Sequence, residues 1–133
     1  MLIRKMTEGR PFRMGQGDTR NVFGPGNGSD HLTFNYARFD PGVAFTPHVH
    51  DDSEDLILVL EGGGFIRLGD ERHPIGPGDV ILVSPGEFHG TIAGPNGLTC
   101  VSVQAPPDPK LYDGSRDGGR DEGRGAGDEG ASR

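Results

Sequence analysis

The chain has 133 residues, a formal net charge of −7 and only 32% hydrophobic residues, a size that favours a single domain. No basic stretch interleaved with aromatic residues is present, which argues against nucleic-acid binding. The longest apolar run, residues 56–60, is too short to span a bilayer and the first residues lack the apolar core of a signal peptide, so we predict a cytoplasmic protein without a membrane partner.

Short β-rich runs alternate with turns of Gly, Pro, Asn and Asp, and no segment has a sustained helical period. Residues 31–39 predict a strand, and residues 45–50 predict an extended segment. The run LILVL at 56–60 is apolar throughout, which is typical of a strand buried on both faces.

Further along the chain we expect two hairpins. The first turns at Gly69-Asp70 and the second around Asn96-Gly97, with a strand within residues 76–89 between them. Many short strands at regular spacing indicate a β-sandwich or a barrel.

The end of the chain has a different composition. Residues 113–133 contain no Val, Ile, Leu, Phe, Tyr or Met. Such a segment cannot bury enough apolar surface to offset the entropy lost on ordering. We therefore predict a folded domain over residues 1–112 and a disordered tail over residues 113–133.

Three histidines have spacings that suggest a metal site. His48 and His50 are one residue apart, so in a strand both rings point to the same face. His89 follows the turn at Pro85-Gly86 and arrives from a different strand. Imidazole nitrogens converging in this way are typical metal ligands. The two other histidines, His31 and His73, lie beside turns and are expected to be exposed.

The same segments resemble the two conserved motifs of the cupin superfamily. Residues 42–62 carry the first motif at Gly42, His48, His50 and Gly62, and residues 78–89 carry the second at Gly78, Gly86 and His89. Ser84 and Ala93 depart from the second motif, where the family has Pro and Asn. The resemblance implies an all-β, double-stranded β-helix (a jelly-roll barrel) with a divalent metal held by two His, one Glu and a third His in its mouth.

The carboxylate ligand has two candidates. Counting back from Gly62 reaches Asp55, whereas counting forward from His50 reaches Glu54, the residue type that the family uses. Neighbouring strand residues face opposite sides, so only one of them can bind, and the spacing favours Asp55. The acid that is not a ligand is the candidate general base if it reaches the cavity.

A mixed imidazole and carboxylate set suits Fe, Mn, Ni, Zn, Co or Cu. The resemblance implies a metal-dependent enzyme of the isomerase, cyclase or dioxygenase type that acts on a small oxygen-rich molecule. The alternatives are a cupin that binds a small molecule or sugar without turnover, and a barrel whose Asp substitution has cost it the metal. The resemblance also implies a homodimer, with which the apolar run at 56–60 is consistent.

Three further side chains have open or structural roles. Cys100 lies in an apolar strand and is expected to be a buried hydrophobic residue. Arg67 either faces the cavity, where it would meet an anionic substrate, or lies on the surface. Phe45 is expected either to line a pocket or to pack in the core.

Overall fold

The structure is a computed structural model that describes residues 1–12, 17–45 and 47–111, so the predicted tail lies outside the described residues. Two short 3-10 helices are present, η1 (Met6–Glu8) and η2 (Pro109–Leu111). The strands are β1 (Arg10–Pro11), β2 (Asp18–Phe23), β3 (Thr33–Phe39), β4 (Glu54–Leu68), β5 (Glu71–Ile75), β6 (Val80–Val83) and β7 (His89–Ala105). Neither helix has the length and apolar character needed to cross a bilayer.

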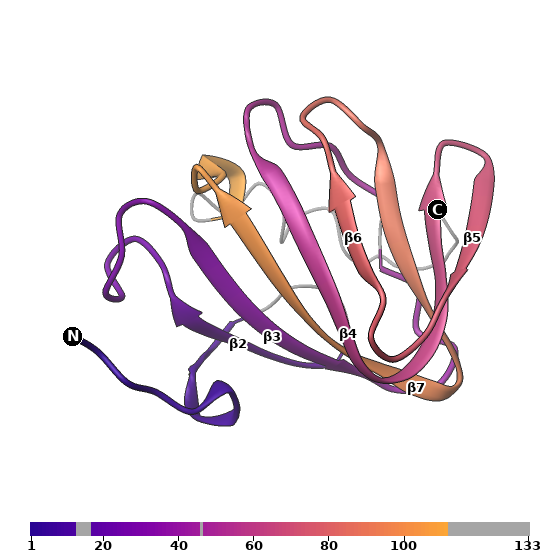
Figure 1. Cartoon of the computed structure of the whole chain (residues 1–133), viewed down its shortest axis with the longest axis horizontal. Helices are drawn as coiled ribbons and strands as arrows, with labels where there is room; N and C mark the ends of the chain where they lie inside the picture. The colour runs from indigo at the N-terminus through magenta and orange to yellow at the C-terminus, as the bar shows by residue number, and fades with distance from the viewer. Residues whose placement is uncertain (13–16, 46, 112–133) are drawn as a thin grey trace.

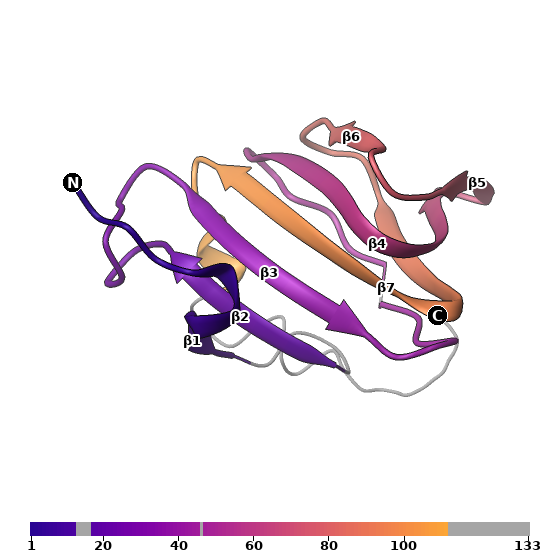
Figure 2. The same ribbon diagram turned by 60° about the horizontal axis from the view of Figure 1, so that its bottom comes forward.

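The long strands β4 and β7 organise the fold, with β2 and β3 on one side of them and β5 and β6 on the other (Figure 1). The second half of β7 lies between β3 and the first half of β4, and β6 pairs with the outer edge of β4. The first half of β7 pairs on one side with the second half of β4 and on the other forms bridges with Ala44 and His48, and β5 completes this side. Figure 2 shows the sheet curling from β2 round to β6. This arrangement is a double-stranded β-helix, as the resemblance to the cupin superfamily implies.

Strand β7 passes through Asn96-Gly97 without reversing, so the hairpin predicted there is wrong. Gly62 of β4 is opposite Leu98, but Gly64 is opposite Ala93, which leaves residues 94–97 as a bulge. A Cβ atom on Gly62 would lie only 2.2 Å from the carbonyl oxygen of Gly97. Glycine at this crossing lets β4 and β7 bend together and pass from one side of the fold to the other. The turn predicted at Gly69-Asp70 is confirmed, because β4 and β5 join there.

The core lies between the two sides of the curled sheet and contains Ala37, Phe39, Ile57, Val59, Ile66, Ile75, Val83, Ala93, Leu98 and Cys100. The expectation that residues 56–60 are buried on both faces is wrong for the single chain. Ile57 and Val59 are buried, whereas Leu56 is 41% exposed and Leu58 is 36% exposed. The outer face of β4 is open to solvent, and the alternation follows from the pleat of the strand.

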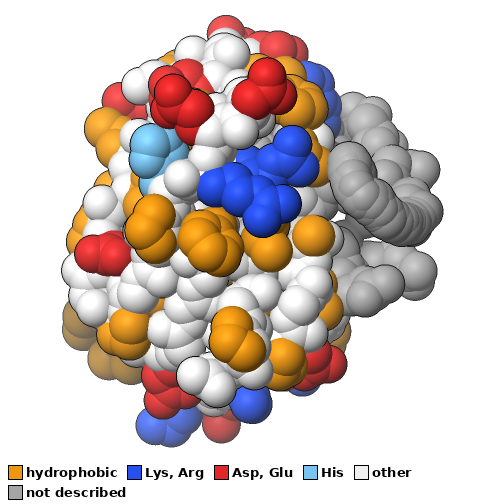
Figure 3. Space-filling model, turned by 90° about the vertical axis from the view of Figure 1, so that its right-hand side faces the viewer, with side chains coloured by type: hydrophobic (Ala, Val, Ile, Leu, Met, Phe, Trp, Pro, Cys, Tyr) orange, Lys and Arg blue, Asp and Glu red, His pale blue; other side chains and the backbone are white. Residues whose placement is uncertain are grey.

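Two cross-strand pairs form an apolar surface on the outside of the barrel. Leu56 is opposite Leu82, and Leu58 is opposite Val80. Leu82 and Val80 are 56% and 59% exposed. We call these four residues the β4–β6 outer face. On the side of the molecule that carries β5 and β6, hydrophobic side chains gather around the middle, beneath a group of basic ones (Figure 3).

Candidate metal centre

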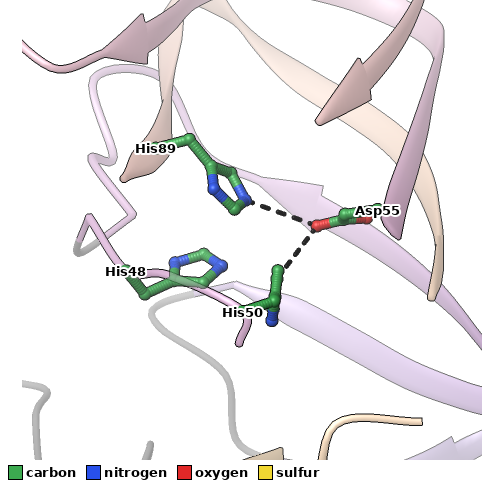
Figure 4. A group of neighbouring side chains, drawn as sticks. All are labelled: His48, His50, Asp55 and His89. Carbon is green, nitrogen blue, oxygen red and sulfur yellow. Dashed lines mark ion pairs between the residues drawn. The ribbon is translucent and has the colours of Figure 1, made fainter. Parts of the chain in front are cut away.

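Four side chains converge inside the barrel (Figure 4). One potential ligand atom from each of His48, His50, Asp55 and His89 lies within 4.8 Å of the other three. The Oδ2 atom of Asp55 is 3.3 Å from Nε2 of His50 and 3.5 Å from Nε2 of His89. Asp55, His50 and His89 are buried, and His48 is half-buried. The structure therefore brings together the three predicted histidines and one of the two candidate acids.

These residues come from three parts of the fold, because His48 and His50 share the connection between β3 and β4. His89 begins β7, and the backbone of His48 forms a bridge with it. Asp55 is the second residue of β4, and His50 lies on the connection that leads into that strand. The ring centroid of His48 is 4.8 Å from that of His50 and 4.4 Å from that of His89. The pairing of residues 44–48 with β7 is thus what places the first motif beside the second.

The structure separates the two candidate acids. Asp55 is 3% exposed and faces the histidines, whereas Glu54 is exposed on the opposite side of the strand. The hydroxyl of Ser102 donates a hydrogen bond to Oδ1 of Asp55 at 2.6 Å. Burial alone would raise the pKa of Asp55, but its contacts with His50, His89 and Ser102 hold it well below its usual value. The buried carboxylate is therefore ionised and ready to bind a cation.

Two histidines are oriented through their Nδ1 atoms. His50 Nδ1 lies 2.7 Å from a carboxylate oxygen of Asp108, and His89 Nδ1 lies 2.9 Å from the carbonyl oxygen of Glu87. Both contacts are made with a proton on Nδ1, so Nε2 is the atom that faces Asp55 and that a metal would bind. Among the described residues, both Nε2 atoms are buried without a hydrogen-bond partner. Unpaired buried nitrogens around a carboxylate are what a transition metal requires, and bonds of about 2.1 Å would place neighbouring ligand atoms roughly 3 to 3.5 Å apart.

A narrow chamber with a cavity volume of about 40 Å³ opens beside the cluster. Its apolar wall consists of Ala37, Phe39, Phe45, Ile57 and Cys100, and its polar side chains besides the cluster are Asn35, Thr91, Ser102 and Gln104. Arg67 is not among the residues that line it. Buried polar atoms of Asn35 (Nδ2) and Gln104 (Oε1) have no partner among the described residues. The chamber therefore suits a small, mainly apolar group whose polar end meets these atoms and the cluster.

The predictions for the remaining histidines and the cysteine are confirmed. His31 is exposed, and His73 has a side chain that is 54% exposed. Cys100 is buried in the core. Burial, together with the negative charge of Asp55, raises the pKa of the Cys100 thiol to about 12.

Sequence reasoning missed four residues around the cluster: Asn35, Ser102, Gln104 and Asp108. The first three share the inward face of β3 and β7 with core residues such as Ala37 and Cys100, but alternation of polar and apolar residues alone would point them to solvent. Asp108 lies in the irregular segment after β7, where no periodicity identifies an inward-facing residue.

The two motifs of this chain are shared with known proteins. Residues 35–101 match the family described as "Cupin domain". The dimethylsulfoniopropionate lyase DddW of Ruegeria pomeroyi is 41% identical over 68 residues, which are 50% of this chain and 43% of that protein. The (R)-mandelonitrile lyase of Granulicella tundricola is 36% identical over 76 residues, 56% of this chain and 58% of that protein. The chain thus spans about half the length of these two curated relatives.

Among solved structures, the polyketide cyclase RemF of Streptomyces resistomycificus superposes with a TM-score of 0.70 and 26% sequence identity, and the match covers 82% of each chain. This similarity extends beyond the two motifs to the strands around them.

Proposed function

This chain is a member of the cupin family, and from that premise we propose that it is a metal-dependent enzyme acting on a small organic molecule with an oxygen-containing group. His48, His50, Asp55 and His89 would hold one divalent transition metal, drawn from Fe, Mn, Ni, Zn, Co and Cu. The observation that carries the proposal is the convergence of these four side chains, three of them buried, beside the chamber that His48, Asp55 and His89 line. When bound, such a metal polarises a substrate oxygen as a Lewis acid.

For the reaction type we favour proton transfer, as in cyclisation, isomerisation or elimination. RemF is named a cyclase, and the two curated relatives are named lyases. We rank the predicted dioxygenase type second, because none of the three relatives described above carries such a name. The shared length is only about half of each curated relative, so their names support the class of reaction rather than a substrate.

The residues of the chain itself supply orientation and a dry environment. The apolar wall excludes water from the reacting group, which strengthens polar interactions there. The Nδ2 group of Asn35 can donate to a substrate oxygen, and Oε1 of Gln104 can accept from a hydroxyl group. No lysine or arginine is found among the described residues that line the chamber. A substrate with little charge outside the cluster is therefore favoured.

The proton acceptor most consistent with this arrangement belongs to the cluster. Apart from the cluster, Cys100 is the one titratable side chain among the described residues lining the chamber, and its pKa of about 12 makes it a poor base at neutral pH. Glu54 is exposed on the other side of β4 and does not reach the cavity, so it cannot serve as the general base there.

The lack of a separate base also favours a second candidate, a cupin that binds a small molecule without turnover. Both candidates use the same chamber and the same four side chains. They differ in whether a bound molecule exchanges or loses a proton.

One experiment separates them. Protein loaded in turn with Mn, Fe, Co, Ni, Cu and Zn is incubated in deuterated water with dimethylsulfoniopropionate, mandelonitrile or an aromatic polyketone, and NMR follows deuterium incorporation and product formation. Catalysis with at least one metal, lost in His89→Ala, supports the enzyme. Binding detected by line broadening, without exchange or product, supports the binding protein.

We also propose that the chain forms a homodimer, with the β4–β6 outer face of one copy covered by that of a second copy. Support comes from two directly paired strands that both present aliphatic side chains to solvent. A two-fold axis would bring identical surfaces together, as in most small homodimers. Cytoplasmic localisation stays a prediction based on the sequence.

A further inference from the structure

Asp108 lies outside both sequence motifs and beyond the residues that match the family, yet its carboxylate contacts the metal cluster. Its Oδ2 atom is 2.7 Å from Nδ1 of His50, and the two side chains are only 4% and 1% exposed. A carboxylate that is buried at this cost needs a strong partner. The partner here is the ring nitrogen on the side of His50 that faces away from the cluster.

This contact determines which nitrogen of His50 faces the other ligands. A carboxylate accepts hydrogen bonds, so Nδ1 of His50 is the donor and carries the proton. In the neutral ring the lone pair is then on Nε2, which lies 3.3 Å from Asp55 Oδ2 and has no hydrogen-bond partner among the described residues. A carboxylate behind a histidine ligand also makes the ring a stronger electron donor.

The segment that carries Asp108 is attached to the connection that carries His50. The hydroxyl of Ser53 donates to the carbonyl oxygen of Pro106, and the ammonium group of Lys110 lies 3.1 Å from a carboxylate oxygen of Asp51. The backbone amide of Lys110 donates to the second carboxylate oxygen of Asp108 at 3.0 Å. Asp108 is thus held from two sides, by His50 and by the first turn of η2.

His89 provides an internal comparison. Its Nδ1 atom donates to a neutral backbone carbonyl, that of Glu87, at 2.9 Å. His50 instead has a charged acceptor at shorter distance. Charge-assisted hydrogen bonds are roughly twice as strong as neutral ones, so His50 is held more firmly than His89.

We propose that Asp108 is a positioning residue for the metal centre, which holds His50 in the Nδ1-protonated tautomer and thereby ties the segment after β7 to metal affinity. The metal part of this inference rests on the proposed function, whereas the tautomer part does not.

The test compares Asp108→Ala and Asp108→Asn with Asp51→Asn, which removes the charge from the exposed ion pair of the same attachment but leaves His50 untouched. Zinc affinity is measured by competition with a chromophoric chelator. We expect a loss of about 10- to 100-fold in Asp108→Ala, a smaller loss in Asp108→Asn, whose amide oxygen still accepts, and a change of less than about 2-fold in Asp51→Asn. Equal affinities in all four proteins would overturn the metal part.

The tautomer is read separately in metal-free protein, from the two-bond 15N–1H correlations of the His50 ring at pH 8. We expect the proton on Nδ1 in the wild type and a shift toward Nε2 in Asp108→Ala. If the wild type binds no zinc, the proposed function fails while the NMR result still decides the role of Asp108. An unchanged tautomer in Asp108→Ala would overturn it. Asp108→Leu, which fills the site but cannot accept a hydrogen bond, serves if the alanine variant fails to fold.

Discussion

The backbone amides of His48 and His89 each donate to the carbonyl oxygen of the other residue, at 2.7 and 2.8 Å. Two residues that exchange both hydrogen bonds are directly opposite each other in an antiparallel pair, so their side chains project to the same face. Their ring centroids lie 4.4 Å apart. The two motifs, which are remote in the sequence, are therefore joined at their histidines by the backbone itself.

Replacing His89 with alanine removes one ligand without breaking this backbone pairing. We expect zinc affinity to fall by more than about 10-fold, because loss of a ligand costs more than loss of the group that orients a ligand. The measurement is metal content by elemental analysis after dialysis against a fixed concentration of free zinc. His73→Ala is the matched control, since that ring is exposed and lies on β5, which is separated from β7 by β4. Equal metal content in the two variants would contradict the site.

Asp55→Asn and Glu54→Gln test which acid is the fourth ligand. Both variants keep the size of the side chain and remove its charge. Asp55 is buried 3.3 Å from His50 Nε2, while Glu54 is exposed. We therefore expect Asp55→Asn to weaken zinc binding by about 10-fold or more and Glu54→Gln to have no measurable effect. The reverse order of affinities would show that β4 shifts its register when the metal binds.

The three histidines and the barrel could be predicted from the sequence because their signals are local. A His-x-His spacing indicates that both rings lie on one face of a strand, and Gly and Pro residues in turns indicate where strands end. The bulge at residues 94–97 could not, since Asn96-Gly97 is also a favourable hairpin turn and only its pairing with Gly62 in β4 makes it a bend. Likewise, the exposure of Leu56 could not be predicted, because it depends on whether another element covers the outer face of β4 in the assembled sheet.

Metal content is expected to fall as the pH decreases below about 6. The lowered pKa of Asp55 keeps this carboxylate ionised through that range, so protonation of the imidazoles is what competes with the metal. Elemental analysis after dialysis at pH 5, 6, 7 and 8 would show the decline, and His73→Ala should follow the same curve. Occupancy at pH 5 equal to that at pH 7 would argue against histidine ligation.

Cys100 is expected to be inert while the protein is folded. Burial, and to a lesser degree Asp55, raises the pKa of its thiol from 9.0 to about 12, so little reactive thiolate exists at pH 8. Labelling with a chromogenic disulfide should be roughly 1,000-fold slower in native protein than in denaturant.

The raised pKa of Cys100 also makes the free energy of unfolding depend on pH. The stabilisation from keeping this thiol protonated is complete below pH 9 and is lost as the pH rises toward 12. Cys100→Ala should lack that alkaline loss, and fast labelling of native protein would contradict the burial.

Leu82→Asp is expected to convert a dimer into a monomer. Leu82 is 56% exposed and directly opposite Leu56, so a carboxylate there would be buried without a partner if two β4–β6 outer faces pack together. Light scattering coupled to size exclusion should give about twice 14.1 kDa for the wild type and one chain mass for the variant. Leu82→Met retains an apolar side chain and should remain dimeric. A wild type with the mass of a single chain would reject the dimer, whereas a dimeric Leu82→Asp would move the interface to another surface.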